Sequence, residues 1–437
     1  MLKFSKIKVV GIAIIALVVT LIWPVYEFYA YRGKAEFLPF YQFIAIPNDS
    51  PTQQQLYKNE YAATGNNAIT LLTQHKTDIN APAISAAVAI DGELIWAGVS
   101  GWSDIDAKTP VTTNTQFRIG STAKALTGTA LARMVDTKLI DLDRPISQYM
   151  NPLPNKAWGR ITARQLASHT AGIPHYKENT DYLGLYKTLA LATRYENVED
   201  ALTIFDDSEL LFTPGTQFSY STLGTVLLSA VMKNAADIPY LEVMQKQVFE
   251  PVKMLSTMAE YQAEGSANLA SFYWNDEGKS NQVRKWRNVD LSHRLAGGGF
   301  VSTSADLVKM GMAFMQDDFI SAPTRAEFWT PQQLPDGSLT PDGYALGWRV
   351  ITRKIDDDIG EITFVNHGGV SRGAQSWLMA LPDHNMAIAV NINANTDVFW
   401  DFGKVSMQLA KIFIQARNDV NLPLNTIKNS ENSENGL

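Results

Sequence analysis

The sequence predicts a mixed α/β fold whose sheet is assembled from both ends of the chain. Runs rich in β-branched and aromatic residues lie at residues 84–99 and again at 346–392. Residues 175–300, between them, are mostly helical and loop-like in pattern. The early and late strands need a common partner surface to bury their apolar side chains. We therefore expect one sheet flanked by helices, with a mostly helical second region.

The first part of this sheet is a hairpin. Two β-rich runs, 84–90 and 93–99, flank Asp91-Gly92, which is the strongest short signal for a two-residue turn. Residues 32–80 precede it and are expected to form a linker and a leading helix at 61–72.

The elements after the hairpin follow from apolar periodicity and from cap and turn residues. Helices are expected at 162–168, where Thr162 and Gln165 form a capping-box pattern, and at 223–232, 305–315 and 402–417. Late strands are expected at 346–351, 362–366, 375–381 and 386–392, with a turn at 382–385 and a glycine loop at 296–299. The folded domain is thus expected over 81–417, with a disordered tail at 418–437.

Residues 1–31 have the pattern of a membrane-targeting segment. Three lysines, at positions 3, 6 and 8, precede an uncharged run from Val9 to Trp23 and a group of aromatic residues. No small-x-small cleavage site follows. We expect an uncleaved anchor rather than a removed signal, with the folded domain outside the cytoplasm. This would be the periplasmic side if the source is a Gram-negative bacterium.

Composition excludes several classes of function. The net charge is −7 over 437 residues, and the sequence contains no block of basic residues. Both observations argue against a nucleic-acid partner. The chain has no cysteine, so a disulfide framework, a thiolate metal site and a cysteine nucleophile are excluded. Its six histidines lack the close spacing of a zinc motif. We expect neither a metal nor a cofactor.

Ser121 and Lys124 are the leading catalytic candidates. Ser121 is expected at the start of an almost wholly apolar helix, and Lys124 lies three residues on, hence on the same face. Burial would lower the pKa of this lysine, and a neutral amine can take the proton of a serine hydroxyl. The alternative is that Ser121 only caps the helix while Lys124 reaches the surface.

Two later stretches add candidates. Tyr220 precedes a second apolar helix; such a tyrosine is usually a packing residue, but beside a lysine its hydroxyl could relay a proton. His367-Gly368-Gly369-Val370 would leave room for a substrate along a strand edge and expose an N–H to an oxyanion. His169 is expected mainly to hold its own loop by hydrogen bonds.

Taken together, these stretches resemble the serine β-lactamase and D-alanyl-D-alanine peptidase superfamily, in its class C-related branch. The branch motifs Ser-x-x-Lys, Tyr-x-Asn and Lys-Thr-Gly or His-x-Gly stand here as 121–124, 220–222 and 367–369. The similarity runs through 117–120, 166–174 and 214–215 and covers about residues 80–415. It implies a β-lactamase/transpeptidase-like fold with an antiparallel sheet.

The resemblance also implies roles for individual residues. Ser121 would be the acylated nucleophile, Lys124 its base or base partner, and Tyr220 a proton-transfer group. The oxyanion would be held by the N–H groups of Ser121 and Val370. His367 would orient the substrate, next to Gly368 and Gly369 of the same motif.

Two departures from the family pattern affect the expected substrate. Thr222 replaces the asparagine that holds a substrate amide, and His367 replaces a permanently charged lysine. Both favour a peptide, a peptidoglycan stem peptide or an ester over penicillins. The alternatives are a β-lactamase proper and a catalytically idle protein that binds peptidoglycan or β-lactams. The oligomeric state is open.

Overall fold

The computed structural model describes residues 6–31, 34–36, 38, 42–275, 281–357 and 359–421. Its main sheet confirms the predicted α/β fold and is antiparallel throughout, in the order β11-β12-β13-β14-β3-β4-β2, with β5 paired to β4. The strands are β2 (Thr52–Leu56), β3 (Ala83–Ile90), β4 (Glu93–Asp104), β5 (Thr109–Pro110), β11 (Arg349–Asp356), β12 (Gly360–Ser371), β13 (Ala374–Leu381) and β14 (Met386–Ile392).

The two ends of the chain meet in the middle of this sheet. β3 pairs with β14, with Val88 opposite Ile388. The predicted hairpin is confirmed, because Asp91 and Gly92 connect β3 to β4 with φ values of +53° and +83°. Positive φ at both central residues is the geometry that matches the twist of a two-residue hairpin.

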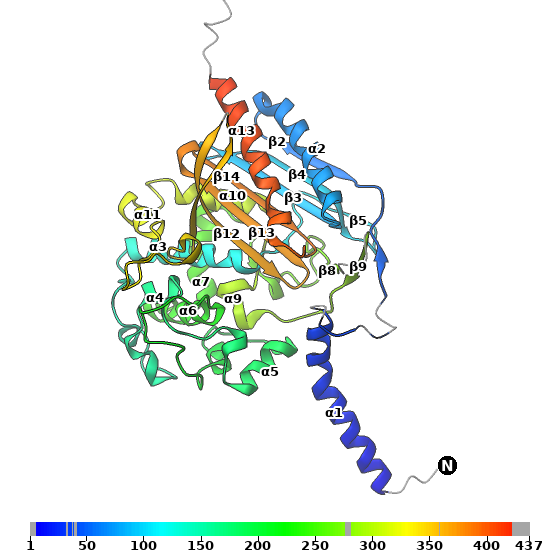
Figure 1. Ribbon diagram of the computed structural model, residues 1–437, viewed down its shortest axis with the longest axis vertical. Helices are drawn as coiled ribbons and strands as arrows, with labels where there is room; N and C mark the ends of the chain where they lie inside the picture. The colour runs from blue at the N-terminus through cyan, green and yellow to red at the C-terminus, as the bar shows by residue number, and fades with distance from the viewer. Residues whose placement is uncertain are drawn as a thin grey trace, which may run out of the picture.

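Helices cover both faces of the sheet (Figure 1). Ile84, Ala86 and Val88 of β3 join a core with α2 (Ala62–Asp78) and α13 (Val405–Asn421). The alternate residues Ala87 and Ala89 point the other way, into a core shared with the helical region. Because both faces are covered, β3 is apolar or small along its whole length instead of alternating with polar residues.

The helical region lies below the sheet in Figure 1. It comprises α3 (Ala123–Asp136), α4 (Ala163–Ala167), α5 (Tyr182–Ala190), α6 (Thr222–Ala236), α7 (Tyr240–Met244), α8 (Glu250–Val252), α9 (Leu295–Gly298) and α11 (Ala322–Phe328). Helix α10 (Ser304–Phe314) packs directly on the sheet. Helix α12 (Phe399–Gly403) precedes α13. The capping box of Thr162 and Gln165 is present at α4, as predicted.

Two small sheets complete the domain. One has the order β6-β10-β7 and the other β1-β9-β8. Their strands are β1 (Ile44–Ala45), β6 (Phe117–Arg118), β7 (Met258–Ala259), β8 (Tyr273–Asn275), β9 (Gln282–Lys285) and β10 (Phe300–Ser302).

Several predicted boundaries differ from the structure. The glycine stretch at 296–299 is largely the helical turn α9 rather than a loop, and β11 begins at Arg349 rather than at 346. The His-Gly-Gly stretch lies inside β12, paired with β13, and not between two strands. The last helix continues to Asn421, and residues 422–437 of the predicted tail lie outside the described residues. The spacing of apolar side chains predicts that a helix or strand exists more reliably than it predicts the first and last residues of that element.

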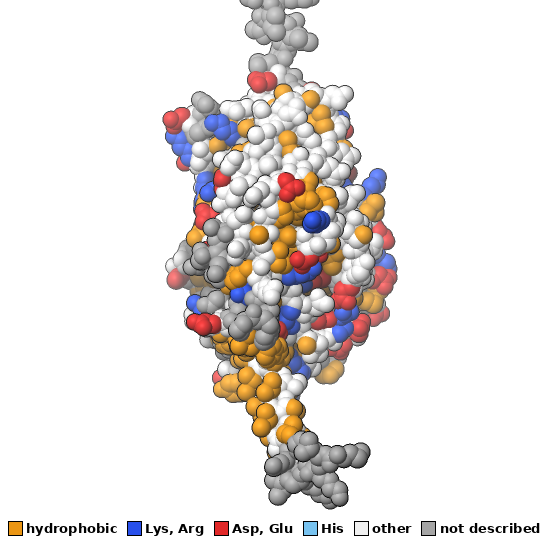
Figure 2. All heavy atoms as spheres, turned by 90° about the vertical axis from the view of Figure 1, so that its right-hand side faces the viewer, with side chains coloured by type: hydrophobic (Ala, Val, Ile, Leu, Met, Phe, Trp, Pro, Cys, Tyr) orange, Lys and Arg blue, Asp and Glu red, His pale blue; other side chains and the backbone are white. Residues whose placement is uncertain are grey.

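Helix α1 (Lys6–Ala30) projects from the domain as a separate rod (Figure 1). Its segment Val9–Ala30 has a mean hydropathy of 2.5 and is long and apolar enough to cross a membrane. Figure 2 shows its hydrophobic side chains exposed below the domain. The far end differs, since Ala30 and the following Tyr31 are buried against the domain.

Candidate active site

Ser121 lies in a short 3-10 turn, Gly120–Thr122, that leads into α3. Thr122, not Ser121, occupies the N-cap position of α3, and no side chain makes a capping bond there. The Ser121 hydroxyl is therefore not used as a cap. Ser121 instead lines a cavity of about 430 Å³ together with residues of α5, α6 and β12.

The turn that carries Ser121 is pressed against β12, and glycine makes this approach possible. A Cβ on Gly369 would lie 1.9 Å from the carbonyl oxygen of Ile119, and one on Gly120 would lie 2.7 Å from backbone atoms of Val370. Gly120 also has a φ of +50°. The space expected for a substrate at Gly369 is filled by backbone. Val370, the next residue, has 52% of its surface exposed and lines the cavity.

Lys124 is almost completely buried, with 2% of its surface exposed. Its Nζ lies 3.3 Å from Oγ of Ser121, 3.1 Å from Oγ1 of Thr222 and 2.9 Å from the carbonyl oxygen of Gly297. Burial lowers the pKa of Lys124 well below its ordinary value, and repulsion from Arg294 and Arg349 lowers it further. The shift favours the neutral form of the amine, as the sequence predicts for a buried lysine.

Helices α6 and α9 supply the other two contacts of Lys124. Ser221 caps α6 by accepting a hydrogen bond from the N–H of Gly224, which leaves the hydroxyl of Thr222 at the first helical position free to face Lys124. Gly297 lies so close that a Cβ there would be 2.7 Å from Cγ2 of Thr222 and 3.3 Å from Nζ of Lys124. The glycine run thus brings a carbonyl group within reach of the lysine.

Tyr220 lies beside this pair. Nζ of Lys124 is 4.9 Å from the centroid of its ring. Burial raises the pKa of Tyr220 to about 12, against the opposing effect of a hydrogen bond with Ser121. The phenol is therefore protonated at neutral pH and can donate or pass on a proton next to Ser121.

Behind Tyr220 runs a buried chain of hydrogen bonds through two histidines and a tyrosine. The N–H of Ser221 donates to Nδ1 of His169 at 3.3 Å, so the proton of this ring is on Nε2, which lies 2.9 Å from the hydroxyl of Tyr344. That hydroxyl lies 3.0 Å from Nε2 of His367, whose Nδ1 lies 2.8 Å from the carbonyl oxygen of Gly368. Every link has one donor and one acceptor if both rings are neutral.

The electrostatics of this chain agree with neutral rings. Burial holds the pKa of His169 and that of His367 well below the usual value, and the positive charge of Arg349 lowers both further. Burial raises the pKa of Tyr344 well above its usual value. The hydrogen-bonded series His169–Tyr344–His367 is therefore fixed at neutral pH. It also positions Tyr220, because the rings of His169 and Tyr220 pack with their centroids 4.3 Å apart.

Comparison with known proteins identifies the family. A family model described as Beta-lactamase matches residues 68–408. The chain belongs to the β-lactamase family. The resemblance stated from its three motifs is thereby confirmed.

This β-lactamase-family chain is similar to several curated proteins. It is 30% identical over 391 residues to the human mitochondrial serine beta-lactamase-like protein LACTB, covering 72% of this chain and 71% of that one. It is 23% identical to penicillin-binding protein 4* of Bacillus subtilis, covering 71% and 68% of the two chains. These relatives support the coarse assignment of a serine hydrolase of the β-lactamase family.

Solved structures agree on the fold. The octameric penicillin-binding protein homologue from Pyrococcus abyssi superposes with a TM-score of 0.65 at 20% identity, covering 80% of this chain and 77% of that chain. The D-amino acid amidase from Ochrobactrum anthropi SV3, complexed with L-phenylalanine amide, also gives 0.65 at 20% identity, covering 80% and 99%.

In this β-lactamase-family protein the structure brings together Ser121, Lys124, Thr222 and Tyr220, and places Val370 at the same cavity. His367 is 1% exposed and both its ring nitrogens are occupied, so it contacts Tyr344 rather than the cavity. Gly368 faces the ring of Phe399, where a Cβ would lie 2.6 Å away. His169 holds its loop, as expected, through the N–H groups of Ser219 and Ser221.

Sequence reasoning missed several residues of the site. Tyr344 and Arg294 lie in turns without a recognisable motif, and only the fold brings them to the catalytic groups. Arg294 lines the cavity, is 7% exposed, and donates to Oγ of Ser371 at 2.9 Å. His175 also lines the cavity, and its Nδ1 accepts a hydrogen bond from the N–H of Thr222.

A second serine pattern lies close by. Residues 369–373 match the Gly-x-Ser-x-Gly spacing of the α/β-hydrolase nucleophile, with Ser371 at the centre. That motif needs a strand followed directly by a helix. Here β12 turns back as β13, and Ser371 accepts a hydrogen bond from Arg294. Ser371 is therefore not placed on a nucleophile elbow.

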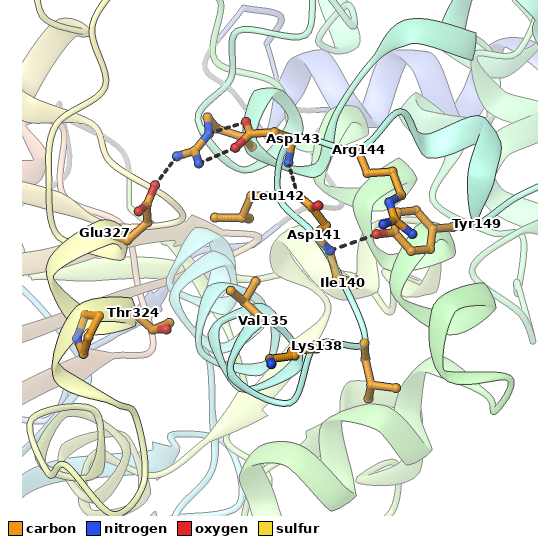
Figure 3. Close-up of a pocket in the computed structure, with 13 residues that line it drawn as sticks. Val135, Lys138, Ile140, Asp141, Leu142, Asp143, Arg144, Tyr149, Thr324 and Glu327 are labelled. Carbon is orange, nitrogen blue, oxygen red and sulfur yellow. Dashed lines mark hydrogen bonds and ion pairs between the residues drawn. The ribbon is translucent and has the colours of Figure 1, made fainter.

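Another cavity, of about 540 Å³, lies at the far end of α3, about 20 Å along the helix from Ser121. Figure 3 shows Asp143 and Glu327, each joined by dashed lines to the same guanidinium group. Arg164 contacts both Asp143 and Glu327. Arg164 is therefore paired across the opening, while Lys138, Asp141 and Arg144 also line this cavity.

Proposed function

We propose that this protein is a membrane-anchored serine hydrolase that acts outside the cytoplasm through an acyl-enzyme on Ser121. The substrates would be peptides, peptidoglycan stem peptides or esters. The observation that carries the proposal is the set of three contacts made by the buried amine of Lys124. The exposed helix α1 supports the anchor.

Counting donors on Lys124 explains how Ser121 is activated. A neutral amine has two N–H donors and one lone pair. The carbonyl oxygen of Gly297 can only accept, and the hydroxyl of Thr222 accepts the second N–H. The lone pair then faces Ser121, whose oxygen is 3.3 Å away. Lys124 is therefore oriented to receive the proton of Ser121.

The reaction follows from this arrangement in two steps. In the first, Oγ of Ser121 bonds to the substrate carbonyl carbon while its proton moves to Lys124. The leaving group takes that proton through the hydroxyl of Tyr220, and an ester on Ser121 remains. In the second, water attacks the ester, gives its proton to the same groups, and Ser121 is released with its hydroxyl restored.

The developing oxyanion would be held by backbone N–H groups of Ser121 and Val370. These two segments are in contact because Gly120 and Gly369 lack side chains. Donors fixed before the reaction stabilise the transition state without having to reorganise.

The cavity also favours a substrate that carries a negative charge near the scissile bond. Arg294 and Arg372 line it, and no Asp or Glu does so among the described residues. In the part of the chain that the structure describes, Arg294 has no carboxylate partner and its Nε has no hydrogen-bond partner. Burying such a cation is costly unless an anion joins it. Arg294 thus supplies the cation that His367 does not.

A turnover panel on the full chain in detergent tests the proposal. It compares p-nitrophenyl esters, peptides ending in D-Ala-D-Ala and a chromogenic cephalosporin, together with labelling by a fluorophosphonate. Hydrolysis and labelling that are both lost in Ser121→Ala support the acyl-enzyme. Neither turnover nor labelling in the wild-type chain would instead favour an idle binding protein, and rapid cephalosporin turnover would make it a β-lactamase.

A further inference from the structure

The end of helix α1 forms part of the cavity that contains Ser121. Phe28 and Tyr31 line this cavity together with Ser121 and Arg294. Both aromatic side chains are buried, with 8% and 4% of their surfaces exposed. The preceding helical turns are exposed, so burial begins only where α1 reaches the domain.

Specific contacts hold this end of α1 in place. The ring of Tyr31 stacks on that of Trp286, with centroids 4.1 Å apart and planes 20° from parallel. The Tyr31 hydroxyl donates to the carbonyl oxygen of Lys285 at 3.0 Å, and Glu27 forms an ion pair of 2.9 Å with Arg287. A flexible tether would need none of these contacts.

The lining of the cavity combines two kinds of side chain. Phe28, Tyr31, Trp274 and Trp286 supply aromatic surface, here called the aromatic wall, and Ser121, Arg294 and Arg372 supply polar groups. The guanidinium of Arg372 lies 4.9 Å from the centroid of the Phe28 ring. An aromatic wall contributes to binding by taking apolar surface out of water. The matching ligand has an apolar segment joined to a carbonyl group.

The position of the wall indicates where such a ligand comes from. The apolar segment of α1 ends at Ala30, directly before Tyr31, and Phe28 belongs to both the helix and the cavity. Aromatic residues at the end of a spanning helix lie at the membrane interface. The cavity is therefore at the level of the lipid headgroups when α1 is inserted.

We propose that Phe28 and Tyr31 are specificity-determining residues, and that the hydrolase acts on amphiphilic esters or amides whose apolar chain is held at the membrane surface. This inference rests on the proposed serine hydrolase activity. It makes α1 a part of the substrate site, so the helix does more than fix the location of the domain.

The test uses the full chain in lipid nanodiscs and two esters, p-nitrophenyl acetate and p-nitrophenyl octanoate. Each methylene that reaches an apolar site contributes about 3- to 4-fold in affinity. We expect Phe28→Ala and Tyr31→Ala to lower kcat/KM for the octanoate by about 10-fold or more and for the acetate by less than about 2-fold. Tyr29→Ala is the matched control, since Tyr29 is on the same turn but 46% exposed.

Tyr31→Phe distinguishes the contribution of the Tyr31 ring to the aromatic wall from the contribution of its hydroxyl group to holding the end of α1 in place. It keeps the ring on Trp286 and removes the hydroxyl bond to Lys285, so octanoate selectivity should be retained. Equal losses for both esters in Tyr31→Ala, or no loss relative to Tyr29→Ala, would overturn the inference. A wild-type chain that hydrolyses neither ester would reject the hydrolase itself.

A binding measurement tests the aromatic wall separately from turnover. The free octanoate anion is the product formed from p-nitrophenyl octanoate. Its binding to the protein can be followed by calorimetry without turnover. Weaker binding in Phe28→Ala and Tyr31→Ala than in Tyr29→Ala supports the aromatic wall. Unchanged binding in all three variants contradicts it.

Discussion

Nζ of Lys124 lies 3.1 Å from the hydroxyl oxygen of Thr222, closer than the 3.3 Å that separates it from Ser121. Thr222 stands at the third position of residues 220–222, where the Tyr-x-Asn motif that this stretch resembles has asparagine. Here its hydroxyl also engages the base. The threonine is therefore suited to fixing the direction of the lysine lone pair, a task that needs one acceptor and no amide.

Thr222→Val tests this role. Valine keeps the shape but removes the acceptor, so the amine loses its orientation, and we expect kcat to fall by about 10- to 100-fold with little change in KM. Thr222→Ser should restore most of the activity. Thr225→Val is the control, because the Thr225 hydroxyl donates to the carbonyl oxygen of Ser221, the N-cap residue of the same helix. Equal activity of Thr222→Val and Thr225→Val would argue against the assignment.

Arg294→Gln should have two separable effects. It removes the cation from the cavity. The value of kcat/KM should therefore fall by about 10-fold more for an ester substrate that carries a free carboxylate than for the same ester with that carboxylate converted to an uncharged amide. It also removes one cause of the lowered pKa of Lys124. The alkaline-rising limb of the kcat profile should then move to higher pH. An unchanged ratio between the charged and neutral substrates would show that Arg294 does not meet the anion.

Tyr344→Phe should destabilise the fold without removing the catalytic groups. The variant keeps the ring but leaves Nε2 of His169 and Nε2 of His367 without their buried partner. Each unmet buried group costs about 1–3 kcal/mol, so the loss of a partner for both groups should lower the free energy of unfolding by about 2–6 kcal/mol. Urea unfolding measures this change. Tyr195→Phe is a suitable control, because the buried Tyr195 hydroxyl has no hydrogen-bond partner among the described residues, and it should change stability little.

Buried histidines should make stability depend on pH on the acid side of neutrality. The pKa of His169, of His293 and of His367 is held well below the ordinary value, chiefly by burial. Below pH 6.5 the unfolded chain therefore binds more protons than the folded chain, and the free energy of unfolding falls as the pH falls. For His175, whose pKa burial lowers to about 3, this window extends from about pH 6.5 to about pH 3.

Unfolding by urea at pH 7.5 and pH 5.5 checks this dependence. Each histidine that stays neutral in the fold contributes at most about 1.4 kcal/mol per pH unit below 6.5. His293→Gln should make the loss between the two pH values smaller than in the wild-type chain. His384→Gln, at a partly exposed turn, should change it less. A free energy of unfolding that is the same at pH 7.5 and pH 5.5 would contradict the conclusion that these buried histidines are neutral in the folded protein.

The sequence allowed much of this architecture to be predicted, and the reasons are local. Asp91-Gly92 and the capping box at Thr162 act over two to four residues, and the structure has both. The lowered pKa of Lys124 could be predicted because its helix is almost wholly apolar. Tyr344, Arg294 and Gly297 could not be predicted as members of the site. Their roles come from long-range packing, which no local pattern encodes.

The glycines of the third motif show the same limit. Two adjacent glycines predict that something approaches the backbone, but not what approaches it. At Gly369 it is the carbonyl oxygen of Ile119, and at Gly368 it is the ring of Phe399. Only the fold distinguishes these neighbours from a substrate.

The pairing of β3 with β14 has a consequence for synthesis. The central sheet cannot close until the strand ending at Ile392 has left the ribosome, because β14 lies between β3 and the strands that form the wall beside Ser121. Contacts so distant in sequence form late. A growing chain thus has Ser121 and Lys124 long before it has the β12 segment that completes their surroundings. The hydrolase is expected to remain inactive throughout its own translation.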